Sequence, residues 1–268
     1  MKVENDLSAL KEIINDLLKL HSVTIELATQ GKFKYKDKVY ECVVSKSKVK
    51  TSSMVAMIAG QSVKTILKMS DWRGLPVRDI YPIARSILES HVNAAYIIAE
   101  DDSVAERAIR HVEYASYKQD NRQDGVGEYA LTISTNESID ESLLSEFKKN
   151  KNWTTLNVPD RIRKTGELTG KMAAVSLVGS YSLIYPISSE IIHGSPYGFN
   201  FFFQAYRSKG SGLEKLKEAS AKHIKDILIA VILAISGYLS AFFITYGIEN
   251  LETENQILWN KAMAIGAT

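Results

Sequence analysis

The chain has 268 residues, and 45% of them are hydrophobic, which is enough to bury one substantial core or two small ones. A formal net charge of +2 gives no overall reason to expect nucleic acid or an acidic partner. The single cysteine, Cys42, excludes an internal disulfide framework and a metal site made of several thiolates. The sequence starts as an amphipathic helix and not as a signal peptide, so we expect a cytoplasmic protein.

The first part of the chain predicts a helix followed by a small hairpin. Apolar residues recur at helical spacing through residues 5–30. Aromatic residues then alternate with lysines around a Lys-Asp-Lys turn, which indicates a β-hairpin near residues 32–44. These lysines are able to contact phosphates, as in basic, aromatic-bearing nucleic-acid surfaces. The commoner role of such lysines is to protect a solvated strand edge.

The middle of the chain is read as helical, with polar interruptions. Helical spacing covers residues 51–70, 80–100 and 103–119. Residues 122–135 are polar and glycine-containing, so we expect a surface loop there. Residues 153–167 are charged and are expected to form turns.

Two further helices are expected in the second half of this region. A capping box begins a short helix over residues 138–149. An apolar helix rich in small residues runs from 168 to about 185, where Pro186 ends or kinks it. The fold class is therefore all-α, a helical bundle. Residues 1–50 form its N-terminal helix and basic hairpin and residues 51–268 the bundle, within one continuous domain.

Residues 227–248 contain no charged side chain, and this run is long and apolar enough for a membrane helix. The same run carries a narrow seam of small residues, Ala230, Ala234, Gly237 and Ala241, which suits the central helix of a bundle. We favour burial, because the many amphipathic helices of the chain need an apolar element on which to pack. A membrane span is the alternative.

Two stretches of the chain each place a polar pair four residues apart on an otherwise apolar helix. The first pair is Arg85 and Glu89; the second is Ser189 and His193, just ahead of a Gly-Ser-Pro sequence. Because burying unpaired polar groups is costly, we expect the two pairs to meet in one site. His91 falls on the apolar face of the first helix and is expected to point at a neighbouring helix.

Simpler roles exist for each of these residues. Arg85 and Glu89 are spaced as an ordinary helix ion pair. Ser189 and His193 are placed to close a helix end, and His91 is placed as a core histidine. The sequence has no glycine-rich phosphate loop, no H-E-x-x-H and no G-x-S-x-G, and its histidines lack paired metal spacing. We therefore expect no cofactor and no metal.

The run from Ala84 to Glu89, ARSILE, and the run from Tyr185 to Ser195, YPISSEIIHGS, resemble a bacterial domain family of unknown function. That family carries R-x-x-x-E on one helix and S-x-x-x-H-G or S-x-x-x-H-x-S on a later one. The resemblance covers roughly residues 50–245. It implies an all-α fold and a polar cluster, and it supplies no reaction. The residues of that cluster would be Arg85, Glu89, Ser189 and His193.

Arg85 and His91 also resemble the R-x4-6-H motif of HEPN ribonucleases, helical proteins of toxin and antiviral defence systems, with Ser86 in place of the usual Asn, Asp or His. The resemblance implies an arginine that stabilises phosphate charge and a histidine that moves protons, without a metal. Two functions stay open. One is such a ribonuclease, using Arg85 with His193 or His91. The other is a non-catalytic helical sensor or scaffold. A membrane-tethered version of either, attached through residues 227–248, is a third option. The expected partners are RNA and a second copy of the chain or another protein.

Overall fold

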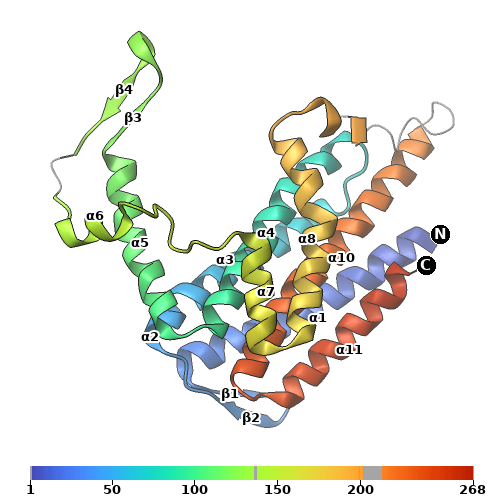
Figure 1. The fold of residues 1–268 in the computed structure, drawn as a ribbon. Helices are drawn as coiled ribbons and strands as arrows, with labels where there is room; N and C mark the ends of the chain where they lie inside the picture. Colours follow the sequence, from blue (N-terminus) through green and yellow to red (C-terminus); the bar gives the residue numbers. More distant parts are fainter. Residues whose placement is uncertain (1, 136–137, 199, 202–212, 268) are drawn as a thin grey trace.

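The fold is organised around one long helix, α10 (Leu213–Thr245), in the computed structural model (Figure 1). The structure describes residues 2–135, 138–198, 200–201 and 213–267. Every residue from 227 to 243 is buried. The expected central helix is therefore confirmed, and it ends at Thr245, where Gly247 turns the chain with φ 67°.

The helices around α10 pack on it through their apolar faces. They are α1 (Lys2–Gln30), α4 (Ile80–Ala99), α8 (Lys171–Ile192) and α11 (Glu249–Gly266). The small-residue seam lets α8 approach closely, since a Cβ on Gly237 would lie 2.6 Å from Leu177 Cγ. Pro186 does not end α8, which continues to Ile192.

Within the described residues, two helices, α8 and α10, have the length and apolar composition of a membrane span. Of the most apolar stretch of each, 33% is buried in α8 and 89% in α10. Burial inside the bundle accounts for the apolar character of α10, because a core helix needs the same composition.

A helix stands where charged turns are expected from the sequence. It is α7 (Val158–Thr169), and it packs against α4 and α8. Asn157 caps its start by accepting from the backbone N–H of Asp160 at 2.8 Å, and Pro159 occupies its first turn. Half of its buried positions are threonines whose hydroxyls bond back to the helix carbonyls, so the apolar pattern is weak.

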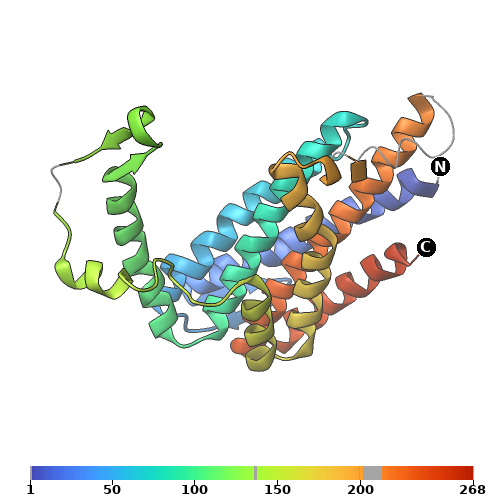
Figure 2. The same ribbon diagram turned by 45° about the horizontal axis from the view of Figure 1, so that its top comes forward.

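The N-terminal hairpin is confirmed, with β1 (Lys32–Tyr35) antiparallel to β2 (Lys38–Glu41). A second hairpin, β3 (Arg122–Asp124) and β4 (Leu131–Ile133), occupies the segment expected to be a loop. It lies in an arm, residues 102–135 and 138–147, that projects from the bundle (Figures 1 and 2). The arm also contains α5 (Asp102–Asp120), the single turn η3 (Gly127–Tyr129) and α6 (Glu141–Phe147).

The remaining elements connect the hairpin to the bundle. They are α2 (Lys46–Lys48), the π-helical turn η1 (Val49–Ser53), α3 (Met54–Met69) and the 3₁₀ turn η2 (Leu75–Asp79). The first three run on from one another, and α3 packs against α4. The fold class is thus all-α with small hairpins, as expected.

Candidate functional site

Arg85 and Glu89 lie one turn apart on α4 and form an ion pair. Arg85 Nε donates to Glu89 Oε1 at 2.8 Å, and both side chains are partly buried. The guanidinium also lies over the ring of Tyr185 on α8, with Cζ 4.1 Å from the ring centroid. Burial works against the charge of Arg85, but the hydrogen bond and charge of Glu89 outweigh it and raise the pKa. The arginine therefore stays cationic while it joins two helices.

A second arginine, Arg161, reaches the same place from α7. Its Nη1 donates to Asn93 Oδ1 of α4 at 2.5 Å, and its Cζ lies 5.5 Å from the centroid of the Trp153 ring. Burial lowers the pKa of Arg161, whereas the negative charge of Glu89 opposes that shift. Its Nε is buried without a hydrogen-bond partner. Sequence reasoning missed this residue because it missed α7.

Two tyrosines of α8 complete the arrangement. Tyr181 and Tyr185 stack with their ring centroids 4.6 Å apart. Burial raises the pKa of Tyr181, so its phenol stays protonated at neutral pH. We call Arg85, Glu89, Arg161, Tyr181 and Tyr185 the arginine–tyrosine cluster. With two guanidinium groups, one carboxylate and two aromatic faces, it has the composition to bind an anion that also carries a flat ring.

Ser189 and His193 lie further along α8, one and two turns beyond Tyr185. By the rise of an α-helix, His193 is about 12 Å along the axis from Tyr185. Among the described residues, no hydrogen bond or ion pair joins these two side chains to Arg85 or Glu89. The structure brings Arg85 and Glu89 of α4 together with Tyr185 of α8. It places Ser189 and His193 further along α8, at the end of that helix.

His193 directly follows the last residue of α8, and backbone groups end the helix there. Gly194, with φ 62°, donates to the Ile191 carbonyl at 3.1 Å, and the Ser195 N–H donates to the Glu190 carbonyl at 3.0 Å. The His193 N–H donates to the Ser189 carbonyl at 3.1 Å. Because the stop uses main-chain groups, the exposed imidazole of His193 is not needed for it.

His91 faces the interior, as its position on the apolar face indicates. It is completely buried, and its Nδ1 donates to the Ile87 carbonyl at 2.9 Å. Its ring lies 5.6 Å from that of His21 and 5.8 Å from that of Tyr238, measured between centroids. Burial lowers the pKa of His91 to about 4. At neutral pH this histidine is uncharged, and it points away from the surface on which Arg85 lies.

Three lysines of the N-terminal hairpin, Lys32, Lys34 and Lys36, are ion-paired within the chain. Lys36 Nζ lies 2.6 Å from Glu254 Oε1 of α11, and Lys32 Nζ lies 2.5 Å from Glu41 Oε1. Tyr35 donates to the same Glu254 carboxylate at 3.1 Å. The hairpin is thus tied to the bundle, which fits the role of a lysine-protected strand pair better than that of a phosphate surface.

No group of three or more His, Cys, Asp or Glu side chains able to hold a metal occurs in the part of the chain that the structure describes. A family model, described as a family of unknown function (DUF5677), matches residues 60–210, more than half of the chain. The matched region contains the arginine–tyrosine cluster together with Ser189 and His193. No curated protein and no solved structure matches the chain.

Proposed function

The chain belongs to DUF5677, a family of unknown function, and we propose that it is a metal-independent ribonuclease whose arginine–tyrosine cluster binds single-stranded RNA. The observation that supports this proposal is the setting of Arg85. Its ion pair uses Nε, so the two amino groups lie outside that bond, and the guanidinium covers the Tyr185 ring. Arginine amino groups bind phosphate in pairs, and bases stack on tyrosine and arginine planes.

In this proposal Glu89 orients Arg85, which holds a phosphate further along the strand than the one that is cleaved. The strand then follows α8 past Ser189 to His193, about 12 Å further on by helix rise. His193 takes the proton of the attacking ribose 2′-hydroxyl as general base. The 2′-oxygen then bonds to phosphorus to give a 2′,3′-cyclic phosphate, the P–O5′ bond breaks, and the leaving 5′-oxygen takes a proton from the protonated His193 or from water. His91 is unsuited to the role of base, because it is fully buried with a pKa of about 4. Such an activity would act as a toxin or an antiviral effector.

The test uses the purified chain with labelled single-stranded RNA in the presence of EDTA. The wild type should cleave RNA and leave DNA of the same sequence intact, because DNA lacks the 2′-hydroxyl. Arg85→Ala should weaken binding and His193→Ala should abolish cleavage while RNA still binds. The matched control is Arg163→Ala, which removes an exposed arginine of α7 that is ion-paired to Glu167. A folded wild type that leaves RNA intact would refute the proposal.

One observation favours a non-catalytic sensor or scaffold as the second candidate. The arginine–tyrosine cluster joins α4, α7 and α8 to one another, which is how a purely structural polar cluster fixes helix register. In that case Glu89→Ala should lower the melting temperature, and neither the wild type nor the variant should bind or cleave RNA. If the cluster serves RNA instead, Glu89→Ala should reduce RNA binding with little change in melting temperature.

A further inference from the structure

In the arm, residues 102–135 and 138–147, α6 supports one face of α5, and α2, η1 and α4 contact α5 near the bundle. On that face α6 packs against α5 through Tyr114, Leu143 and Phe147. Glu146 fixes the contact, since its carboxylate accepts from Arg107 Nη1 and from Arg110 Nε, each at 2.8 Å. Figures 1 and 2 show α5 leaving the bundle, with the hairpin at its far end.

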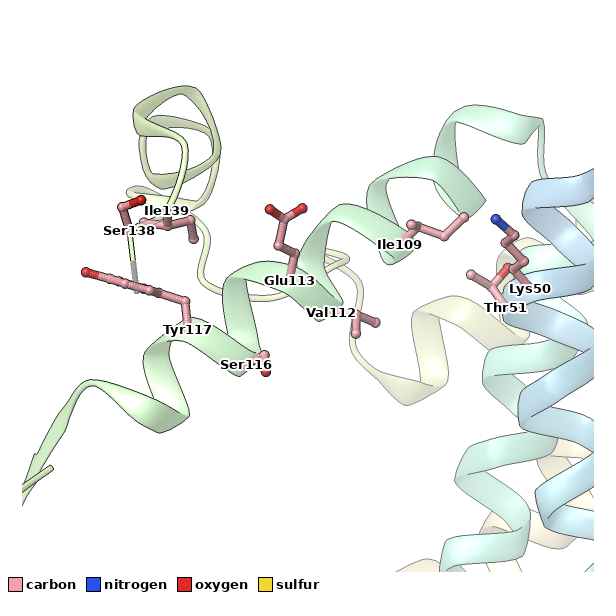
Figure 3. A pocket seen from close by; sticks show the side chains of 9 residues that line it. All are labelled: Lys50, Thr51, Ile109, Val112, Glu113, Ser116, Tyr117, Ser138 and Ile139. Atoms are coloured by element: carbon pink, nitrogen blue, oxygen red, sulfur yellow. The ribbon is translucent and has the colours of Figure 1, made fainter. Parts of the chain in front are cut away.

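A second face of α5 lines an open groove of about 700 Å³ (Figure 3). Its α5 residues follow helical spacing, so they form one continuous stripe: Ile109, Val112, Glu113, Ser116 and Tyr117. Lys50 and Thr51 of the bundle close one end, and Ser138 and Ile139 close the other. Val112, in the middle of the stripe, is 66% exposed.

The tip of the arm exposes a second apolar surface. Val126 is 84% exposed, Tyr129 83% and Leu131 62%. The strands of this hairpin are three residues long, and such a two-stranded unit gains little stability without a surface to pack on. The groove and the tip are therefore both apolar surfaces that the described part of the chain leaves uncovered.

We propose that the occupant of both surfaces is a second copy of this chain, held by two arms that run antiparallel about a twofold axis. In this arrangement the α5 stripe of one copy packs on the α5 stripe of the other. A helix of 19 residues is about 28 Å long. Antiparallel pairing of the two stripes carries each hairpin tip toward the bundle end of the partner's groove, where Lys50 and Ile109 lie. The same contact is then made twice, as a closed dimer requires.

Charges at the two ends of the arm fit this pairing. Lys50, at the bundle end of the groove, and Glu128, at the hairpin tip, are both exposed and form no ion pair within the described residues. Antiparallel arms bring Glu128 of each copy to Lys50 of the other. Within one chain Lys50 lines the groove with Ile109, whereas Glu128 lies beyond the end of α5 at Asp120, so their attraction is available only between copies.

The first experiment measures the mass of the purified chain by light scattering after size exclusion. We expect twice the chain mass of 29.9 kDa. Val112→Asp should give the monomer, because it places a charge in the middle of the α5 stripe. The control is Val175→Asp, a 43% exposed valine of α8 outside the groove, which should stay dimeric. A monomeric wild type, as expected if the groove binds a different protein, or a dimer that survives Val112→Asp would overturn the proposal.

The second experiment tests the pairing of the two ends. Lys50→Glu should weaken the dimer, and adding Glu128→Lys should restore it. In a Cys42→Ser background, Lys50→Cys with Glu128→Cys should form a disulfide between chains, seen as a doubled mass on a non-reducing gel. A charge reversal that is not rescued, or an absent cross-link in a dimeric sample, would contradict the antiparallel arrangement.

Discussion

Two basic side chains on α4, Arg85 and His91, lie within two turns of each other and have opposite environments. Arg85 lies at the edge of the bundle, where a carboxylate and an aromatic ring keep it charged. His91 lies in the interior, against two other rings, where burial keeps it neutral. Their spacing fits a ribonuclease motif, but the two residues face different neighbours. Spacing along a helix therefore identifies candidates, and the environment of each side chain decides its chemistry.

The largest expected difference between edge and interior is in stability. His91→Ala should lower the free energy of unfolding by about 2–4 kcal/mol, because it leaves a cavity among fully buried residues. Arg85→Ala should cost less than about 1 kcal/mol, as expected for a partly exposed ion pair. Urea denaturation of the two variants at neutral pH measures both values. Equal losses would show that the two environments do not differ as the structure indicates.

The pH dependence of stability sharpens the same comparison. The pKa of His91 falls from 6.5 to about 4 in the fold. Below pH 6.5 the unfolded chain takes up a proton that the folded chain refuses, so stability is present above that pH and is lost as pH falls toward 4. For this residue alone the loss between pH 7 and pH 5 is about 2 kcal/mol.

Denaturation at pH 7 and at pH 5 tests the origin of that loss. His91→Gln should reduce the difference between the two pH values, because glutamine does not titrate. Arg85→Ala should show the wild-type difference, since arginine keeps its charge over this range. His21 and His223, whose pKa values burial lowers to about 3 and about 4, remain in all of these variants and leave a residual slope. An unchanged pH dependence in His91→Gln would exclude His91 as its source.

The sequence is informative where a pattern has one physical cause. A long run without charge has to be buried or to span a membrane, so α10 was predictable as a central helix. The alternation of aromatic residues and lysines around a Lys-Asp-Lys turn was sufficient to predict the first hairpin. The ion pair of Arg85 and Glu89 follows from helical spacing alone.

The two elements that the sequence did not predict, α7 and the second hairpin, have weak patterns of apolar residues. The buried face of α7 carries Thr165 and Thr169 as well as Val158 and Ile162, so counting apolar residues understates it. Arg161 was missed with that helix. The second hairpin was missed because its strands are short and its apolar residues face outward. Which side chains of different helices contact each other depends on how distant segments pack. The spacing of residues within one segment does not reveal those contacts. A signal that was available is Asn157 followed by Pro159, a helix start.

The smallest expected effect concerns the contact between Arg85 and Tyr185. A guanidinium over a partly exposed ring contributes about 0.5–1 kcal/mol, which a double-mutant cycle with Arg85→Ala and Tyr185→Leu can resolve. We expect a favourable coupling of that size in stability, because Cζ lies 4.1 Å from the ring centroid. The matched cycle pairs Arg163→Ala with Tyr185→Leu and should give no coupling.

If RNA occupies the arginine–tyrosine cluster, Arg85→Ala and Tyr185→Leu should be less than additive in RNA binding, because the arginine and the ring hold one nucleotide together. Strict additivity in both stability and RNA binding would mean that the two side chains act separately. The arginine–tyrosine cluster would then neither join the helices nor bind RNA.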